Sequence, residues 1–267
     1  MSKGKGGKNL RGRAGRMQGG RGSGRAGKGA TRLWGRHAVE AALMNPRRQH
    51  RKLWATLEGI DSLDGELPAD FPLERAEVAD LARLVAKDAP HQGLVLECEP
   101  LDDLHLDEVL DGDPSRPIVV LDQVTDPHNV GAILRSAAAF NAAAIVTQDR
   151  HAPPEGGVIG KAASGALEIV PWVRVVNLSR ALEEIAEAGY WRIGLTGEAD
   201  ATLAEALPAG PVALVLGAEG EGMRHNVTQH CDALARLPIS EAMESLNVSN
   251  AGAIALYAVA TRPTFDR

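Results

Sequence analysis

Between Ile118 and Ala260 the sequence alternates short apolar segments with longer segments of mixed polarity, and this alternation constrains the fold more than any other feature. Apolar runs of about four to eight residues are typical of buried strands, whereas apolar residues recurring every three or four positions are typical of helices. We expect strands at 118–121, 144–147, 169–173, 192–196, 212–216 and 233–237. We expect helices at 130–140, 157–165, 178–188, 223–230 and 245–260. Such alternation predicts an α/β domain with a mainly parallel sheet covered on both faces.

The rest of the chain divides into three further parts by composition. Residues 31–100 read as a small α/β domain, with helices near 35–43 and 74–85 and strands near 51–56 and 93–98. Residues 101–113 are acidic and are followed by Pro114 and Pro117, so residues 101–116 are expected to be a linker to the larger domain at 117–267. Because ligands of parallel sheets bind beyond the carboxyl ends of the strands, we look for function at those ends.

The first 30 residues differ sharply in charge from the remainder. They contain nine Lys or Arg, eleven Gly and no acidic residue, although the whole chain has a net charge of −6. With no apolar pattern to stabilise a fold, this segment is expected to be a flexible basic arm that binds phosphate backbones. A mitochondrial presequence is a competing interpretation, but the glycines oppose the amphipathic helix that it would need.

Several classes of protein are disfavoured by what the sequence lacks. It contains no apolar run of the roughly 18–20 residues that a membrane helix requires, so no membrane partner is expected. Cys98 and Cys231 lack the CxxC spacing of a metal or redox site and are interpreted as reduced thiols. The histidines show no ligand spacing, so no metal is expected. Together these features favour a reducing, cytoplasmic setting.

The first strand-to-helix junction of the large domain, residues 121–135, combines helix caps with an arginine. Asp126 or Asn129 can cap the following helix. Arg135 lies seven residues after His128, and therefore on the same helical face, among Ala, Ile, Leu and Phe. An arginine in an apolar stripe must be paired or must serve a ligand. Its planar donors suit a phosphate or a developing oxyanion.

The second junction, residues 214–223, follows an apolar strand with three glycines. Gly217, Gly220 and Gly222 would let the backbone approach a flat ligand, or would simply form a turn. Glu219 between them can hydrogen-bond the loop amides. No GxGxxG or Walker lysine is present here, which disfavours a phosphate-binding loop.

The third junction, residues 237–253, leads into the last predicted helix. Ser245 is a natural N-cap for this helix. Capping does not explain why Asn247, Ser249 and Asn250 occur together in the first turns, because short polar residues are mediocre helix formers. These polar residues are therefore candidates for a binding site.

Taken together, the three junctions resemble the signature motifs of the SpoU group of RNA ribose 2′-O-methyltransferases, in the SPOUT class. The resemblance extends from about Ile118 to Tyr257 and includes residues 161–166 and 176–179. Residues 34–43 and 91–93 further resemble the amino-terminal domain of the 23S rRNA guanosine 2′-O-methyltransferases. The resemblance implies methyl transfer from S-adenosyl-L-methionine to a ribose hydroxyl of RNA, with ribosomal RNA favoured. It also implies a homodimer, a small amino-terminal RNA-binding domain and a carboxy-terminal trefoil knot.

The resemblance also assigns roles to individual residues. The predicted cofactor-binding residues are Thr196, Gly217, Leu237 and Leu246. The predicted catalytic residues are Arg135, Asn129, Glu219, Asn247 and Ser249. Arg135 would stabilise the alkoxide or grip the adjacent phosphate, because arginine stays protonated in proteins. The remaining four would orient groups around the reacting centre, and the acceptor of the hydroxyl proton stays open.

Three other functions are compatible with parts of the sequence. The nearest is the same chemistry on transfer RNA, since the catalytic motifs do not distinguish the substrates. A non-catalytic RNA-binding or ribosome-assembly protein is opposed by the intact motif residues. A nicotinamide-dependent dehydrogenase is opposed because the only GxGxxG, at 22–27, lies in the basic arm.

Apart from that arm, RNA attraction is expected to depend on Arg32, Arg36, Arg47, Arg48, Arg51 and Lys52.

Overall fold

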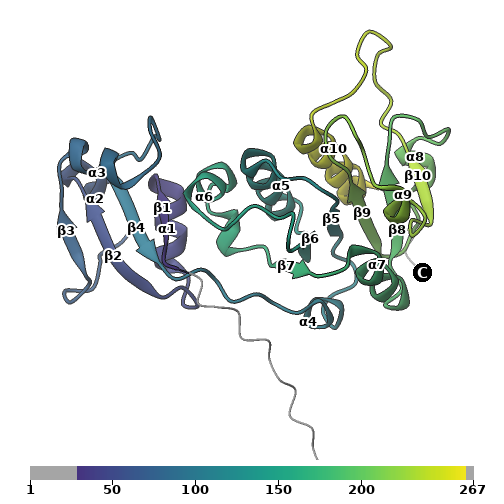
Figure 1. The fold of residues 1–267 in the computed structure, drawn as a ribbon. Coiled ribbons are helices and arrows are strands. Elements are labelled where there is room, and N and C mark those ends of the chain that lie inside the picture. The colour runs from purple at the N-terminus through teal and green to yellow at the C-terminus, as the bar shows by residue number, and fades with distance from the viewer. Residues whose placement is uncertain (1–28, 263–267) are drawn as a thin grey trace, which may run out of the picture.

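The computed structural model describes residues 29–262 and contains two sheets, each with its own helices (Figure 1). The predicted arm at 1–30 lies outside the described residues, except for its last two. No helix within residues 29–262 is long and apolar enough to cross a membrane.

The amino-terminal unit is built on a four-stranded mixed sheet. Its strand order is β1-β4-β2-β3, in which β4 is antiparallel to both of its neighbours and β3 is parallel to β2. The elements in chain order are β1 (Thr31–Trp34), α1 (Arg36–Met44), β2 (His50–Ala55), α2 (Leu57–Asp61), β3 (Leu73–Arg75), α3 (Val78–Leu84) and β4 (Leu94–Cys98).

The carboxy-terminal unit is built on a six-stranded sheet in which every pairing is parallel. Its strand order is β10-β8-β9-β5-β6-β7. The first elements are β5 (Ile118–Leu121), α5 (Pro127–Ala139), β6 (Ala144–Gln148), α6 (Gly157–Ala163), the 3-10 helix Ala166–Glu168 and β7 (Trp172–Val175). The remaining elements are α7 (Leu178–Glu187), β8 (Trp191–Leu195), α8 (Leu203–Ala206), β9 (Val212–Leu216), α9 (His225–Thr228), β10 (Ala233–Ala235) and α10 (Val248–Thr261). The predicted parallel α/β domain is therefore confirmed.

Alternate residues of the parallel strands face two separate cores. In β5, Val119 packs in a core with α5, α6 and α10, whereas Val120 packs in a core with α7 and α9. This alternation follows from the two-residue period of a strand, and it explains why the central strands are apolar at every position. The first core continues into the amino-terminal sheet through residues such as Leu33 and Leu96.

The structure corrects several of the predicted elements. The expected linker at 101–116 contains a short helix, α4 (Leu106–Leu110), whose Leu106 and Val109 are buried against the second core. The single helix expected near 74–85 divides into strand β3 and helix α3. The strand expected at 169–173 starts only at Trp172, because the chain first forms the 3-10 helix and then passes through Pro171, which has no amide to donate. Strand β1 and helix α2 were not predicted.

A buried ion-pair cluster joins the two units. Arg48, in the amino-terminal unit, has a fully buried side chain that binds Glu168 and Glu155 of the carboxy-terminal unit. Asn45 donates a further hydrogen bond of 2.7 Å to Glu168. Burial alone would lower the pKa of Arg48, but the hydrogen bonds and charges of the two glutamates outweigh it and raise that pKa above its usual value. The expectation that Arg48 binds RNA is wrong, because both of its anionic partners are internal.

Candidate active site

The carboxyl ends of three neighbouring strands meet at one edge of the parallel sheet. β10, β8 and β9 are adjacent, and each is followed directly by a segment predicted to bind the cofactor. Adjacent strands lie about 4.8 Å apart, so the three ends span roughly 10 Å, the width of a nucleoside. Within the described residues, the amides of Gly197, Gly217 and Leu237 donate no hydrogen bond. The topology thus brings Thr196, Gly217 and Leu237 to one place with backbone donors that a ligand can use.

The loop after β9 is a tight turn that requires its glycines. Ala218 and Gly222 exchange two backbone hydrogen bonds of 3.0 Å, and Gly220 and Gly222 have φ values of 82° and 67°. A Cβ atom on Gly217 would lie 2.2 Å from the carbonyl carbon of Gly222, which no side chain can tolerate. The turn therefore folds back on its own start and holds Glu219 at its tip.

Glu219 joins the second junction to the other two through hydrogen bonds. Its Oε1 accepts from Asn129 Nδ2 at 2.9 Å and from Asn247 Nδ2 at 2.6 Å. Asn247 Nδ2 also donates to Asn129 Oδ1 at 3.0 Å. We call these three residues the Asn-Glu-Asn cluster. Their hydrogen bonds connect the start of α5, the turn after β9 and the start of α10, although the residues are up to 118 positions apart.

Asn247 also caps the last helix. Its Oδ1 accepts from the amides of Ser249 at 2.9 Å and Asn250 at 3.4 Å, and from the Ser249 hydroxyl at 2.5 Å. The prediction that Ser245 caps this helix is wrong, since α10 begins at Val248, three residues later than expected. At the first junction Asp126 is the cap, accepting from the His128 amide at 3.0 Å. Asn129 is therefore free of a capping role and available to the cluster.

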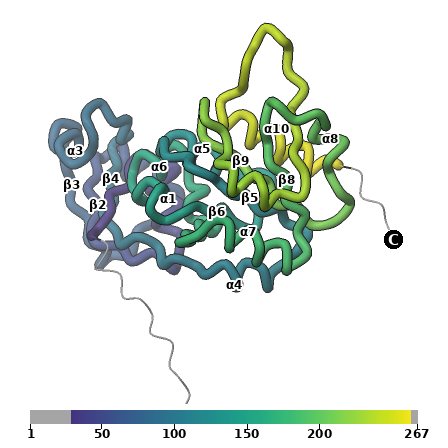
Figure 2. Tube along the Cα trace, turned by 45° about the vertical axis from the view of Figure 1, so that its right-hand side comes forward, coloured from purple at the N-terminus to yellow at the C-terminus, as the bar shows by residue number. Residues whose placement is uncertain are grey.

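The loop between β10 and α10 carries the remaining predicted cofactor residue, Leu246. This loop projects from the body of the protein (Figures 1 and 2). Leu246 is half-buried and directly precedes Asn247 of the cluster. α10 then packs against β9 closely enough that a Cβ on Gly252 would lie 3.0 Å from Leu216 Cδ1. The cluster thus fixes the end of the loop to the parallel sheet.

Arg135 lies on the exposed face of α5 and is separate from the Asn-Glu-Asn cluster. The prediction that it sits inside an apolar stripe is wrong, because the apolar residues of α5 face the core while His128 and Arg135 face outward. Arg135 is six residues beyond Asn129, which is about 9 Å along the helix axis. Within residues 29–262 it forms no hydrogen bond or ion pair, so its guanidinium can bind an external anionic group.

A buried carboxylate, not predicted from the sequence, anchors the second junction. Asp122 is fully buried after β5, and it accepts from the Arg224 amide at 2.8 Å and from Arg224 Nε at 2.8 Å. Arg224 Nη2 also donates to Gln148 Oε1 at 3.0 Å. This network ties Arg224, two residues after the glycine turn, to the ends of β5 and β6. A polar residue directly after a fully apolar strand was the available sequence signal.

The surface cations expected to attract RNA are mostly paired with carboxylates. Arg32 binds Glu97, Arg51 binds Glu99, Lys52 binds Glu74 and Arg36 binds Asp64. Ion pairing neutralises much of their field, so this surface of the small unit is less basic than its sequence indicates.

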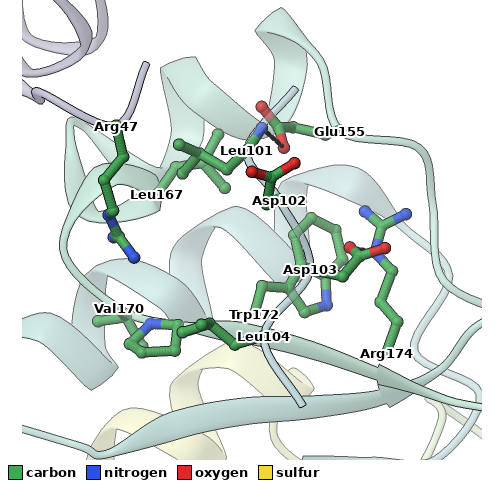
Figure 3. A pocket seen from close by; sticks show the side chains of 11 residues that line it. Arg47, Leu101, Asp102, Asp103, Leu104, Glu155, Leu167, Val170, Trp172 and Arg174 are labelled. Atoms are coloured by element: carbon green, nitrogen blue, oxygen red, sulfur yellow. Dashed lines mark hydrogen bonds and ion pairs between the residues drawn. The ribbon is translucent and has the colours of Figure 1, made fainter. Parts of the chain in front are cut away.

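A small pocket lies where the segment before α4 crosses the carboxy-terminal unit (Figure 3). Its lining includes Arg47, Asp103 and Trp172, and the guanidinium of Arg174 lies 4.2 Å from the centre of the Trp172 ring. The pocket has a volume of about 30 Å³, room for one or two water molecules. It is too small for a nucleoside and contains none of the predicted site residues.

Comparison with known proteins identifies matches to both units. Residues 116–257 match the model of the SpoU rRNA Methylase family, and residues 32–104 match a model described as RNA 2′-O ribose methyltransferase substrate binding. The chain is 38% identical over 245 residues to the 23S rRNA (guanosine-2′-O-)-methyltransferase RlmB of Pseudomonas aeruginosa, covering 87% of this chain and 97% of the relative. The RlmB of Ralstonia nicotianae is 41% identical, with 84% and 93% covered. The solved SpoU methyltransferase AviRb of Streptomyces viridochromogenes, in complex with AdoMet, has a similar fold, with a TM-score of 0.70, 23% identity, and 87% and 89% covered.

Proposed function

Because this chain belongs to the SpoU rRNA methylase family, we propose that it transfers a methyl group from S-adenosyl-L-methionine to the 2′-hydroxyl of a guanosine ribose in 23S rRNA. Relatives named for this activity match the chain over nearly their whole length. The match of residues 32–104 to a substrate-binding model favours ribosomal over transfer RNA, since the catalytic motifs alone do not distinguish them.

The observation that carries the proposal is the Asn-Glu-Asn cluster. Two amides and one carboxylate from three distant segments are held within hydrogen-bonding distance at the edge where β8, β9 and β10 end. One member of the cluster, Asn129, lies on α5, the helix that also carries Arg135, which is exposed and has no protein partner among the described residues. A cluster with a purely structural role would not need to lie at the strand ends and to share a helix with an exposed arginine.

The residues at the strand ends fit S-adenosyl-L-methionine. The free amides of Gly197, Gly217 and Leu237 are suited to the polar edge of an adenine or to a carboxylate, while half-buried Thr196 and Leu246 supply the rest of the wall. When bound, this cofactor supplies a methyl group that is already activated by a sulfonium. The protein then has to position the acceptor hydroxyl in line and manage its proton.

We assign Arg135 to the acceptor side of the reaction. Its guanidinium would stabilise negative charge that develops on the ribose oxygen, or hold the adjacent phosphate, because arginine remains protonated in proteins. Glu219 is engaged by two amide donors, so we assign it and both asparagines to positioning. Ser249, whose hydroxyl donates to Asn247 Oδ1, orients the Asn247 side chain.

Assembly and topology complete the proposal. The exposed side of α10 carries Ile254 and Tyr257, which are 46% and 58% exposed, and this apolar surface supports a homodimer.

From β10 at the sheet edge the chain returns past β8 and β9 to pack α10 on α5, and we propose that this passage forms the trefoil knot. Action on ribosomal RNA would place the protein in the cytoplasm, and the basic arm would add salt-dependent RNA affinity.

Methylation of defined RNAs tests the proposal. Purified protein would be incubated with methyl-labelled S-adenosyl-L-methionine and separate 23S rRNA, 16S rRNA and tRNA transcripts, and 2′-O-methyl positions would be mapped by resistance to alkaline cleavage. We expect one protected guanosine in 23S rRNA. Label found only in tRNA would favour the tRNA enzyme. Cofactor binding without transfer to any RNA, including ribosome-assembly intermediates, would favour a non-catalytic protein.

A further inference from the structure

A second pocket, lined by both apolar and polar residues, lies in the amino-terminal unit, away from the strand ends. It has a volume of about 460 Å³ and opens between α2, the start of α3 and the segment before β4. These elements lie at the left of Figure 1. This volume is within the usual range for small-ligand sites of about 300–1,000 Å³. The residues that matter for its chemistry are Arg36, Glu58, Ser62, Val78, His91 and Gln92.

Two of the residues that line the pocket have an unusual backbone conformation. Gln92 and Gly93 have φ values of 53° and 76°, in the left-handed region that non-glycine residues seldom adopt. A Cβ on Gly59 would lie 2.3 Å from the Gly93 carbonyl oxygen, so the two segments are in direct backbone contact. Strained backbone of this kind is concentrated at binding sites.

The conformation leaves fixed hydrogen-bond donors in the pocket. His91 Nδ1 accepts from the Gly93 amide at 3.2 Å, and burial lowers the pKa of His91, so its neutral ring carries the proton on Nε2. Gln92 Oε1 accepts from the Arg36 amide at 3.2 Å and from Lys161 Nζ at 2.5 Å, which leaves its amide nitrogen as a donor. Within the described residues neither of these donors has a partner. The exposed Glu58 carboxylate supplies an acceptor on the same wall.

The pocket also connects physically to the proposed active site. Lys161, which binds Gln92, belongs to α6, and α6 packs on α5 so closely that a Cβ on Gly131 would lie 2.5 Å from Ala162 Cβ. α5 in turn carries Asn129 and Arg135. Lys161 forms no ion pair with a carboxylate in the described part of the chain, so a cation lies between the pocket and that helix.

We infer that this pocket binds one unpaired nucleobase of the RNA substrate, from a nucleotide outside the one that is methylated. Sequence-specific RNA recognition uses unstacked bases whose edges meet fixed donors and acceptors. His91 and Gln92 would read the edge of the base, Val78 would contact the base plane, and Lys161 would attract the adjoining phosphate. The inference rests on the proposed function, since it takes the ligand to be that substrate.

A charge-matched pair of variants tests the pocket. Val78 lines it and is 61% exposed, whereas Met44 is 74% exposed at the other end of α1, about 12 Å along the helix from Arg36. Val78→Glu and Met44→Glu therefore add the same charge to exposed apolar positions of one unit. We expect the KM for 23S rRNA to rise at least tenfold in Val78→Glu and in His91→Ala. We expect less than twofold change in Met44→Glu, with cofactor affinity unchanged in all three.

Two outcomes would overturn the inference. One is a KM for 23S rRNA within twofold of the wild type in both pocket variants. The other is ultraviolet cross-linking of the full chain to 23S rRNA that yields no nucleotide-bearing peptide from residues 56–62 or 88–93. Failure of the proposed function would look different, because the wild type would then bind no cofactor or methylate no rRNA. Cross-linking and direct measurement of RNA binding by the same variants would then still show whether the pocket binds a base.

Discussion

Asn247 has two roles that a single substitution can separate. Its Oδ1 caps α10, and its Nδ2 donates to Glu219 and Asn129. Asn247→Asp keeps the cap, because aspartate is as good an N-cap as asparagine, but it places a second carboxylate beside Glu219. Asn247→Ala removes both roles. Comparing the two variants therefore isolates the hydrogen bonds of the Asn-Glu-Asn cluster from the stability of the helix.

The expected loss can be worked from the contacts. Asn247→Asp removes two hydrogen bonds, at 2.6 and 3.0 Å, each contributing about 1 kcal/mol at an exposed position. Two carboxylates about 4 Å apart repel by about 1 kcal/mol in water. Together these changes cost about 2–3 kcal/mol. If this whole free energy is lost from the catalytically active arrangement of the cluster, kcat falls 30- to 150-fold. Asn247→Ala should additionally lose about 1 kcal/mol of folding stability with the cap.

The assay is methyl transfer to 23S rRNA together with thermal unfolding. We expect kcat to fall 30- to 150-fold in Asn247→Asp, with a free energy of unfolding lower than that of the wild type by at most about 3 kcal/mol. The double variant Asn247→Asp with Glu219→Gln should recover at least tenfold of that loss, because the glutamine amide can donate to the new carboxylate. An unchanged kcat in Asn247→Asp, or no recovery in the double variant, would refute a positioning role for the cluster.

Three further predictions follow from single sites. Arg135→Ala should abolish methyl transfer while calorimetry shows unchanged S-adenosyl-L-methionine binding, and near-normal turnover would remove Arg135 from the chemistry. Burial raises the pKa of Cys98 to about 12 and of Cys231 to about 11, so iodoacetamide at pH 8 should modify both only after denaturation, as mass spectrometry would detect. Hydrogen bonds from Arg192 lower the pKa of Asp232 below its ordinary 3.8, so the free energy of unfolding measured in urea should fall as pH drops below about 4, and Asp232→Asn should flatten that dependence.

The sequence predicted the parallel sheet well because its signal is local. The strands at 118–121 and 212–216 were predicted with their observed bounds, since buried parallel strands are apolar at every position. The start of α10 was missed because Ser245 and Asn247 are equally good caps. Only the hydrogen bonds that Asn247 donates to Asn129 and Glu219 select Asn247 as the cap. That choice depends on residues more than 25 positions away.

Other errors also come from partners that are remote in the sequence. Arg48 reads as a surface cation, yet it is buried because Glu168, 120 residues away, faces it across the two units. Arg135 was placed in an apolar stripe because its sequence neighbours are apolar, whereas those neighbours face the core and Arg135 lies on the outward face of α5. Lys161 and Gln92 could not be paired from the sequence at all, since nothing in either segment indicates the other.

A crystal structure of the protein with S-adenosylhomocysteine would show directly whether the strand ends bind the cofactor. We expect the adenosine to lie against the backbone of Thr196, Gly217 and Leu237, with the sulfur directed toward the side of the Asn-Glu-Asn cluster. Arg135 of one protomer should lie within reach of the acceptor position, either in the same subunit or across a dimer interface. Density for the ligand elsewhere on the protein, with the ends of β8, β9 and β10 unliganded, would contradict the proposed cofactor site.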